Sequence, residues 1–316
     1  MGLGTLYNKL ALTSPHTEVM LRKLYWKNVK RLKKFSPYGA GVENTSKTVF
    51  SFEDVIDYLR QKGVGEGSLL VVHSSFDNLT GCGLKPQEII AQLRLLIGES
   101  GTLAMPAIRI FKGEPAGIDV LRPVDESLVC EYDVKRTPLI SGMLPFTLLR
   151  TKGSVVSHFP YNPLVAVGPL ALQMMEHNLE GEYPSAHGKM SCWKFCMDHN
   201  AIVVGLGVDL EHHNTMAHVM EEAYDGWRWN NDEWYRKRTF DIIDEERDKK
   251  RVTIYERRPE WGTMHIAELN FATGLYKAGI IERTYFGDIP VCVERAQTLR
   301  DYLQSINKKG FPYYKF

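Results

Sequence analysis

The sequence lacks the patterns that mark several large protein classes. No apolar run approaches the roughly 18 residues of a membrane-spanning helix, and the N-terminus shows no secretory pattern. No GxGxxG follows a predicted strand, and neither GxxxxGK[ST] nor GxSxG occurs. The standard dinucleotide, P-loop and serine-hydrolase sites therefore lack their motifs. The formal net charge is only +1, so no global field favours nucleic acid or a membrane surface as a partner.

Cysteine is scarce, and its count is odd. The five cysteines are Cys82, Cys130, Cys192, Cys196 and Cys292. In a chain of 316 residues, this usage is typical of reduced thiols in a cytoplasmic protein rather than of a disulfide framework. The sequence is 44% hydrophobic and 24% charged, which predicts a soluble globular protein with one large or two modest domains.

The first part of the chain differs from the rest. Residues 15–35 alternate apolar and basic positions and predict a basic amphipathic helix. We expect this helix to dock on its own protein or on a second subunit, with peripheral contact to an anionic membrane as the alternative. Residues 36–47 read as a polar connection. The predicted division is a helical extension, residues 1–48, followed by one domain, residues 49–316.

From Ser51 onward, strand and helix patterns alternate. SFEDVIDYLRQKGV, KPQEIIAQLRLLIG and ISGMLPFTLLRT predict helices, and Ser51 serves as the N-cap of the first. SLLVVHSS, GTLAMPAI, PLVAVG and AIVVGLGV predict strands. This order predicts an α/β fold with a mixed central sheet covered by helices on both faces. The charged stretch 244–258 predicts a solvated loop or a hairpin.

A short motif after the last of these strands carries candidate chemistry. NTMAHVMEE spans residues 214–222 and predicts the start of a helix. The spacing of Thr215, His218 and Glu221 or Glu222 then places these side chains on one helical face. A histidine with a pKa near neutrality can act as a general base there.

Three segments in order resemble a known family. They are VVHSSFDNLTGCGLKPQEIIAQLRLLIGESGTLAMPAI, TPLISGMLPFTLLRTKGSVVSHFPYNPLVAVG and AIVVGLGVDLEHHNTMAHVMEE. Together they resemble the aminoglycoside 3-N-acetyltransferase family, from about Ser51 to the C-terminus. The resemblance implies the α/β fold of that family, acetyl-CoA as the cosubstrate and a small-molecule amine as the acceptor. No metal and no nucleic acid partner are expected.

The resemblance also suggests roles in acetyl transfer. His218 would remove the proton of the attacking amine, and the Thr215 hydroxyl would stabilise the developing oxyanion. The histidine needs an acidic partner to fix its orientation. The family places an acid about two dozen positions further on, which selects Asp241 first. Glu221, which is closer in sequence, is the second choice.

The cofactor site is expected where strands end. In open α/β sheets ligands gather at the carboxyl ends of strands, and the resemblance places the cofactor loop in the same region. The residues expected to bind acetyl-CoA are His73, Ser74, Ser75, Ser157, His158 and Asn162. The loop at residues 157–162 departs from the family's His-Pro-x-x-Ser pattern. Asn162 takes the place of the serine hydroxyl that this pattern would supply.

The acceptor is less well determined by the sequence. A pI near 7.7 favours a phosphate-bearing amino sugar, as a sugar nucleotide or polysaccharide precursor, over a polycationic aminoglycoside antibiotic. A non-catalytic assembly module that retains the fold is the alternative of another class. The sequence does not decide between a monomer and a homo-oligomer.

A metal site is the remaining alternative. His187, Cys192, Cys196 and His199, or His212, His213 and His218, have the chemistry of zinc ligands. The Cys-x-x-x-Cys spacing lacks a second cysteine pair, so the sequence favours acetyl transfer over zinc binding.

Overall fold

The computed structural model describes most of the chain. The described residues are 9–32, 48–112, 125–182, 184–211, 214–225, 232–258 and 265–306. The expected connection, residues 36–47, lies outside them.

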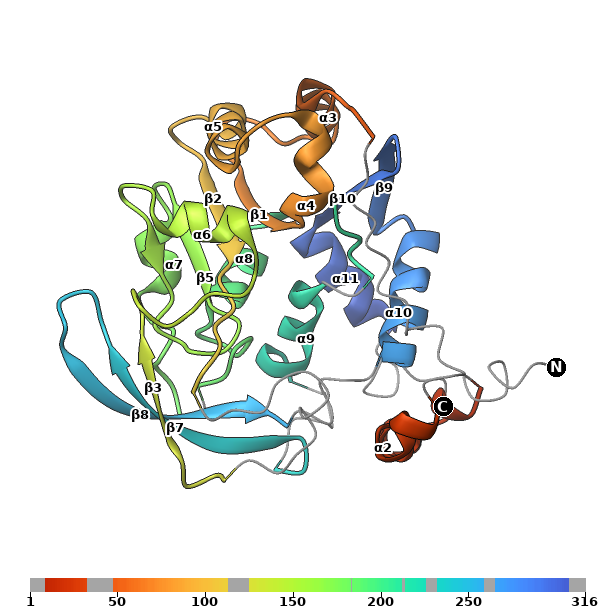
Figure 1. Ribbon diagram of the computed structural model, residues 1–316, viewed down its shortest axis with the longest axis vertical. Coiled ribbons are helices and arrows are strands. Elements are labelled where there is room, and N and C mark those ends of the chain that lie inside the picture. Colours follow the sequence, from red (N-terminus) through yellow and green to blue (C-terminus); the bar gives the residue numbers. More distant parts are fainter. Residues whose placement is uncertain are drawn as a thin grey trace.

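A seven-stranded mixed sheet forms the centre of the molecule (Figure 1). Its strand order is β4-β5-β2-β1-β6-β10-β9. The strands are β1 (Leu69–Ser74), β2 (Thr102–Pro106), β4 (Val155–Val156), β5 (Leu164–Val167), β6 (Ile202–Leu206), β9 (Ile281–Phe286) and β10 (Ile289–Arg295). The central strand β1 pairs in parallel with both β2 and β6. These three strands are continuous apolar runs because helices cover both faces of the sheet.

Helices pack on both faces, as the sequence predicts. One face carries α3 (Phe52–Gln61), α4 (Phe76–Leu79), the 3₁₀ turn Thr80–Cys82, α5 (Pro86–Ile97) and α6 (Met143–Leu149). The other face carries α7 (Ala171–Met175), α8 (Cys192–Asp198), α9 (His218–Ala223), α10 (His265–Lys277) and α11 (Ala296–Ile306). On β1, alternate side chains face opposite clusters: Leu70 and Val72 pack with the first set of helices and Val71 with the second.

The helix predicted to begin after Ser51 is confirmed. The Ser51 side chain accepts a hydrogen bond from the Glu53 N–H, as an N-cap should. Gly63 follows the helix with φ of +81°, in the left-handed region that glycine adopts without strain. Ser51 and Gly63 therefore mark the two ends of α3.

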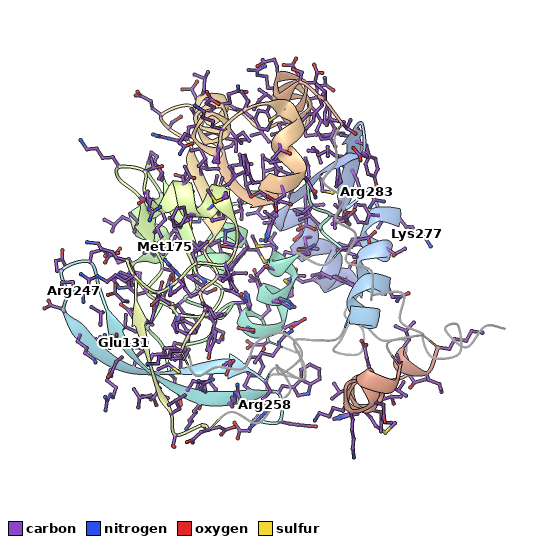
Figure 2. All side chains as sticks on the ribbon, in the orientation of Figure 1. Glu131, Met175, Arg247, Arg258, Lys277 and Arg283 are labelled. Carbon is purple, nitrogen blue, oxygen red and sulfur yellow. The ribbon has the colours of Figure 1, made fainter. Side chains whose placement is uncertain are left out.

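A second, three-stranded sheet packs beside the first. It consists of β3 (Val129–Asp133), β7 (Tyr235–Ile243) and β8 (Lys249–Arg257), and β7 and β8 form an antiparallel hairpin. The charged stretch 244–258 is thus the turn and second strand of a hairpin, which confirms one of the two expectations. Figure 2 shows Arg247 at the turn and Arg258 at the opposite end of the hairpin.

The N-terminal helix is present as predicted and packs on the body of the protein. It is α2 (Pro15–Leu32). Val19 is buried in the same core cluster as α8 and α9, whereas Met20 and Leu24 are exposed. Among the described residues, no helix combines the length and apolarity required to cross a bilayer.

The carboxyl ends of β1 and β6 lie side by side and support the candidate site. The Ser75 N–H donates to the Leu206 carbonyl, and the Asn78 side chain donates to the Gly207 carbonyl. Gly207 has φ of +68°, and a Cβ there would lie 3.0 Å from the Ser75 carbonyl oxygen. The backbone after β6 can turn toward the 214–222 motif because glycine occupies this position.

Candidate active site

The motif at residues 214–222 starts as a tight turn before it becomes a helix. Thr215–Ala217 form a 3₁₀ turn, and α9 begins at His218. Residues three apart eclipse one another in a 3₁₀ turn. Thr215 and His218 therefore share a face, as the spacing predicts, and both are partly exposed.

His218 lies between a carboxylate and a guanidinium group. Its Nδ1 is 3.4 Å from Glu221 and 3.3 Å from the Arg257 guanidinium, and Glu221 and Arg257 form an ion pair with each other. Burial lowers the pKa of His218 well below 6.5, and the charges of Arg257 and His187 lower it further. The imidazole is therefore neutral at pH 7, which is the form that can accept a proton.

A second histidine–carboxylate pair lies directly behind the first. Glu222 accepts hydrogen bonds from the His187 backbone N–H at 2.9 Å and from its Nδ1 at 3.0 Å, and both side chains are buried. Burial would raise the pKa of Glu222, but the His187 contacts lower it to about 2. The His187 and His218 rings lie 5.3 Å apart. Sequence reasoning considered His187 only as a zinc ligand and missed this pair.

Asn162 and His73 join the same cluster. The Asn162 side-chain amide lies 3.2 Å from His187 Nε2, and the Asn162 backbone carbonyl accepts a hydrogen bond from the Trp193 indole at 2.8 Å. His73, at the end of β1, stacks on Trp193 with ring centroids 5.9 Å apart. The structure thus brings together His73, Asn162 and His218, which are distant in sequence.

Asp241 is a correction to the expected site. Its carboxylate accepts hydrogen bonds from Arg251 at 2.7 and 2.9 Å and lies 3.0 Å from Lys249. Arg251 lies on β8, and His218 contacts a different residue of that strand, Arg257. At about 3.3 Å per residue, Arg251 and Arg257 are about 20 Å apart along that strand. The carboxylate that contacts His218 is therefore Glu221, the second choice.

The other residues expected to bind the cofactor lie in three different surroundings. Ser74 and Ser75 lie partly exposed at the end of β1. Ser157 is buried, and its hydroxyl donates to Asn178 at 2.6 Å, so it supports the loop from inside. His158 lies 2.9 Å from Glu245, whose carboxylate raises the pKa of His158. His158 therefore faces the turn of the β7–β8 hairpin and not the histidine cluster.

A cavity of about 810 Å³ adjoins the cluster at Glu222. Among the described residues, its lining carries six carboxylates and four cations. The carboxylates are Glu126, Glu180, Glu182, Glu222, Asp225 and Asp232; the cations are Lys189, Arg236, Lys237 and Arg258. The side chains around this cavity therefore have an excess of negative charge, although the whole chain is nearly neutral. This local charge suits a cationic ligand.

The candidate metal ligands do not gather. In the described ranges, no group of three or more His, Cys, Asp or Glu side chains is placed to hold a metal ion. Cys192 and Cys196 are buried in the core on α8, and burial raises the pKa of Cys192 to about 12. His212 and His213 lie outside the described residues.

Comparisons with known proteins point in one direction. A sequence profile described as aminoglycoside 3-N-acetyltransferase matches residues 71–306. No curated protein sequence matches the chain. Among solved structures, the chain resembles aminoglycoside acetyltransferase AAC(3)-Xa, with 17% identity, 90% of this chain and 98% of that chain covered, and a TM-score of 0.65.

Two further solved structures are similar to the chain. Aminoglycoside acetyltransferase AAC(3)-IIb has 19% identity, with 83% of this chain and 98% of that chain covered and a TM-score of 0.62. A structure described as AAC-IIIb binary with CoASH has 18% identity, the same coverage and a TM-score of 0.60. At these identities the structural likeness establishes the fold.

Proposed function

Because the chain belongs to the aminoglycoside 3-N-acetyltransferase family, we propose that it transfers the acetyl group of acetyl-CoA to an amino group of an aminoglycoside or a related polycationic amine. The observation that carries this choice of acceptor is the surplus of carboxylates around the cavity beside Glu222. The near-neutral charge of the whole chain favoured a phosphate-bearing amino sugar, but the local charge is the one that a bound substrate meets.

His218 is the proposed general base. The neutral acceptor amine attacks the thioester carbonyl, and the C–N bond forms as the oxygen becomes an oxyanion. His218 takes the proton from the resulting ammonium, and collapse of the intermediate breaks the C–S bond and releases the CoA thiolate. The protonated His218 then returns its proton to the thiolate. Glu221 orients the ring and stabilises the imidazolium.

Thr215 is the proposed oxyanion donor. It shares the exposed face of the turn with His218, so both can approach the same carbonyl group. The acetyl-CoA site proposed from strand-end position consists of His73, Ser74, Ser75 and Asn162, next to this face. Ser157 would support that site through its buried hydrogen bond, and His158 would lie at its outer edge.

The decisive experiment measures free-thiol release with acetyl-CoA and a panel of amines. His218→Gln should lower turnover by roughly 10²–10⁴-fold. His177→Gln is the matched control, because His177 is an exposed histidine that also pairs with a glutamate, and it should leave turnover unchanged. Wild-type turnover in His218→Gln would rule out the general base.

A phosphate-bearing amino sugar remains the second candidate acceptor. The observation that favours it is the set of four cations in the cavity lining. Thiol release with sugar nucleotides and none with aminoglycosides would select it over the first.

A further inference from the structure

Asn214, the residue before the catalytic turn, does not cap it. Asparagine at an N-cap position usually accepts a hydrogen bond from the backbone of the first turn. The Asn214 side chain makes no such bond. Its Nδ2 donates instead to Glu294 Oε2 at 2.8 Å. A residue suited to capping is thus used to tie the start of the motif to the central sheet.

Glu294 is a carboxyl group in an apolar place. It lies on β10 between Val203 of β6 and Ile281 of β9, and it is 1% exposed. No cation among the described residues forms an ion pair with it. Buried carboxylates are normally paired, because an isolated buried charge is costly.

The ionisable groups on the elements around Glu294 are bonded elsewhere. On the same face of the sheet, Tyr276 of α10 bonds to Asp209 and Cys292, and Arg283 of β9 bonds to Asp209. On α11, Arg300 pairs with Asp301. On the motif side, His218 and Glu221 contact each other and Arg257.

Within the described part of the chain, two buried oxygens in this contact have no hydrogen-bond donor. They are Glu294 Oε1 and Asn214 Oδ1. A carboxylate and an amide oxygen can only accept, so an ionised Glu294 leaves both unsatisfied. A proton on Glu294 allows its O–H to donate to the amide oxygen while the amide N–H donates back. One proton therefore removes both deficits.

We propose that Glu294 is a positioning residue that carries a proton at neutral pH and holds Asn214, and through it the Thr215–His218 turn, by a reciprocal acid–amide pair. Burial raises the pKa of Glu294 to about 8, against the smaller opposing effect of the Asn214 hydrogen bond. Above that pH the pair loses its donor and gains a buried charge. The turn then loses its attachment to β10, and turnover falls.

Kinetics provide the first test, and this arm rests on the proposed role of His218. Wild-type kcat should fall on the alkaline side with an apparent pKa of about 8. Glu294→Gln should keep neutral-pH turnover and lose this fall, because its amide donates to Asn214 Oδ1 at every pH. Glu282→Gln, on the adjacent strand β9 and exposed, is the matched control and should keep the wild-type profile.

A third variant separates positioning from simple packing. Glu294→Leu keeps the volume and removes both hydrogen bonds, so kcat should fall at all pH values by up to about 10²-fold, with KM for acetyl-CoA little changed. An unchanged alkaline fall in Glu294→Gln, or wild-type kcat in Glu294→Leu, would overturn the proposal.

Thermal unfolding gives a second test that needs no activity. A folded-state pKa of about 8 against an ordinary value of 4.5 means that the folded protein holds the proton more tightly. The stability of the wild type relative to Glu294→Gln should therefore fall between about pH 4.5 and 8 and be level above. A Tm difference independent of pH would refute the protonated carboxyl group even if the acetyl-transfer proposal holds. If the wild-type protein released no thiol, the acetyl-transfer proposal would fail, but this stability test of Glu294 would still apply.

Discussion

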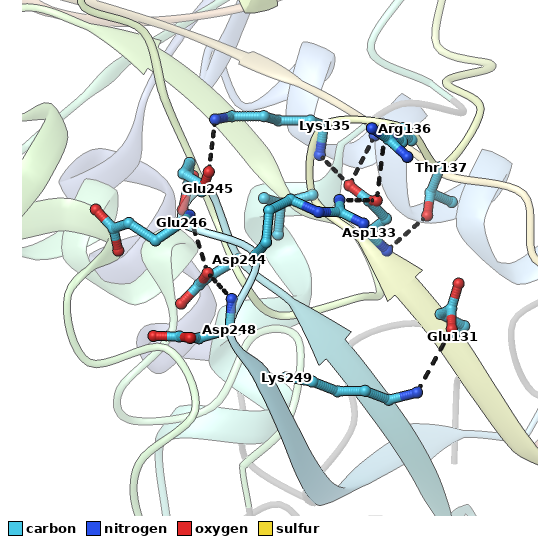
Figure 3. A network of polar contacts seen from close by, with 12 residues as sticks. Glu131, Asp133, Lys135, Arg136, Thr137, Asp244, Glu245, Glu246, Asp248 and Lys249 are labelled. Atoms are coloured by element: carbon cyan, nitrogen blue, oxygen red, sulfur yellow. Dashed lines mark hydrogen bonds and ion pairs between the residues drawn. The ribbon is translucent and has the colours of Figure 1, made fainter.

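Two networks of carboxylates and cations in this molecule use the same residue types in different surroundings. The first surrounds the histidines, where the side chains of His187, Glu222, Glu221 and Arg257 are between 3% and 12% exposed. The second lies on the three-stranded sheet near the hairpin turn and is shown in Figure 3, where the Lys135 backbone N–H donates to Asp133 and Lys249 forms an ion pair with Glu131. In that network the cations are largely solvated: Arg247 and Lys249 are 46% and 50% exposed.

The comparison shows why burial, and not charge pairing alone, indicates the reactive site. An exposed ion pair is screened by water and salt, so its members behave as ordinary charged groups. A buried pair interacts strongly and changes the protonation of its neighbours. The Asp241 carboxylate is 13% exposed, but its partner Arg251 is 65% exposed, so this pair is open to water and salt on the side of the cation. Variants in the two networks test this difference.

The first prediction contrasts the two candidate orienting acids. Glu221→Gln should lower turnover by about 10²-fold, because His218 loses the carboxylate that fixes and stabilises its protonated form. Asp241→Asn should leave turnover unchanged. The double variant His218→Gln with Glu221→Gln should be scarcely worse than His218→Gln alone. A large loss of thiol-release rate in Asp241→Asn would return the orienting role to that residue.

The second prediction concerns stability. Glu222→Ala should lower the free energy of unfolding by about 3–5 kcal/mol, because it leaves the buried His187 backbone N–H and ring without a partner. Glu222→Gln should recover part of the loss, since one amide oxygen can still accept. Denaturant unfolding followed by circular dichroism measures both. Equal stability of all three proteins would show that the pair contributes nothing net.

The third prediction concerns pH. Arg257 and burial keep the pKa of His218 low, so wild-type turnover should persist below pH 6.5. Removing the cation in Arg257→Gln should raise the pKa of His218 and move the acid limb of kcat/KM to higher pH. Arg251→Gln is the control, because it removes a cation from the same strand far from His218. Coincident acid limbs for Arg257→Gln and wild type would exclude this effect of Arg257.

The fourth prediction tests the exposed network directly. Arg247→Gln should reduce the free energy of unfolding by less than about 1 kcal/mol, and the difference should vanish in 1 M salt, where screening is strong. Urea unfolding at low and high salt measures this. A salt-independent loss would mean that the Arg247–Asp133 contact behaves like the buried pairs.

Most of the fold follows from local patterns in the sequence. The apolar runs at β1, β2, β5 and β6 and the cap at Ser51 each predict an element that the structure contains. These signals depend only on neighbouring residues, so each predicts its element without knowledge of the rest of the chain. The strand order is not local. The pairing of β3 with β7, which joins Cys130 to Phe240, has no counterpart in any short window of sequence.

The candidate site was predictable to the extent that its parts are local. Thr215, His218 and Glu221 lie within two turns, so spacing alone places them on one face. The His187–Glu222 pair joins the turn before α8 to helix α9 and needs tertiary structure. The sequence signal for this pair is Glu222, the second glutamate of Met220-Glu221-Glu222. Glu222 lies at i+4 from His218 and has no assigned partner within the motif. Asp241 was selected by distance along the chain, which does not give distance in space.

The position of β6 has a consequence for the order in which the protein folds. β6 pairs with β1, where Leu70 meets Ile202, and with β10, where Arg295 meets Ile202. Contacts between residues so distant in the chain require closure of long loops and form slowly. During synthesis, β1 and β2 emerge long before their neighbour β6. Until β6 is made, one edge of β1 stays unpaired, and unpaired strand edges promote aggregation.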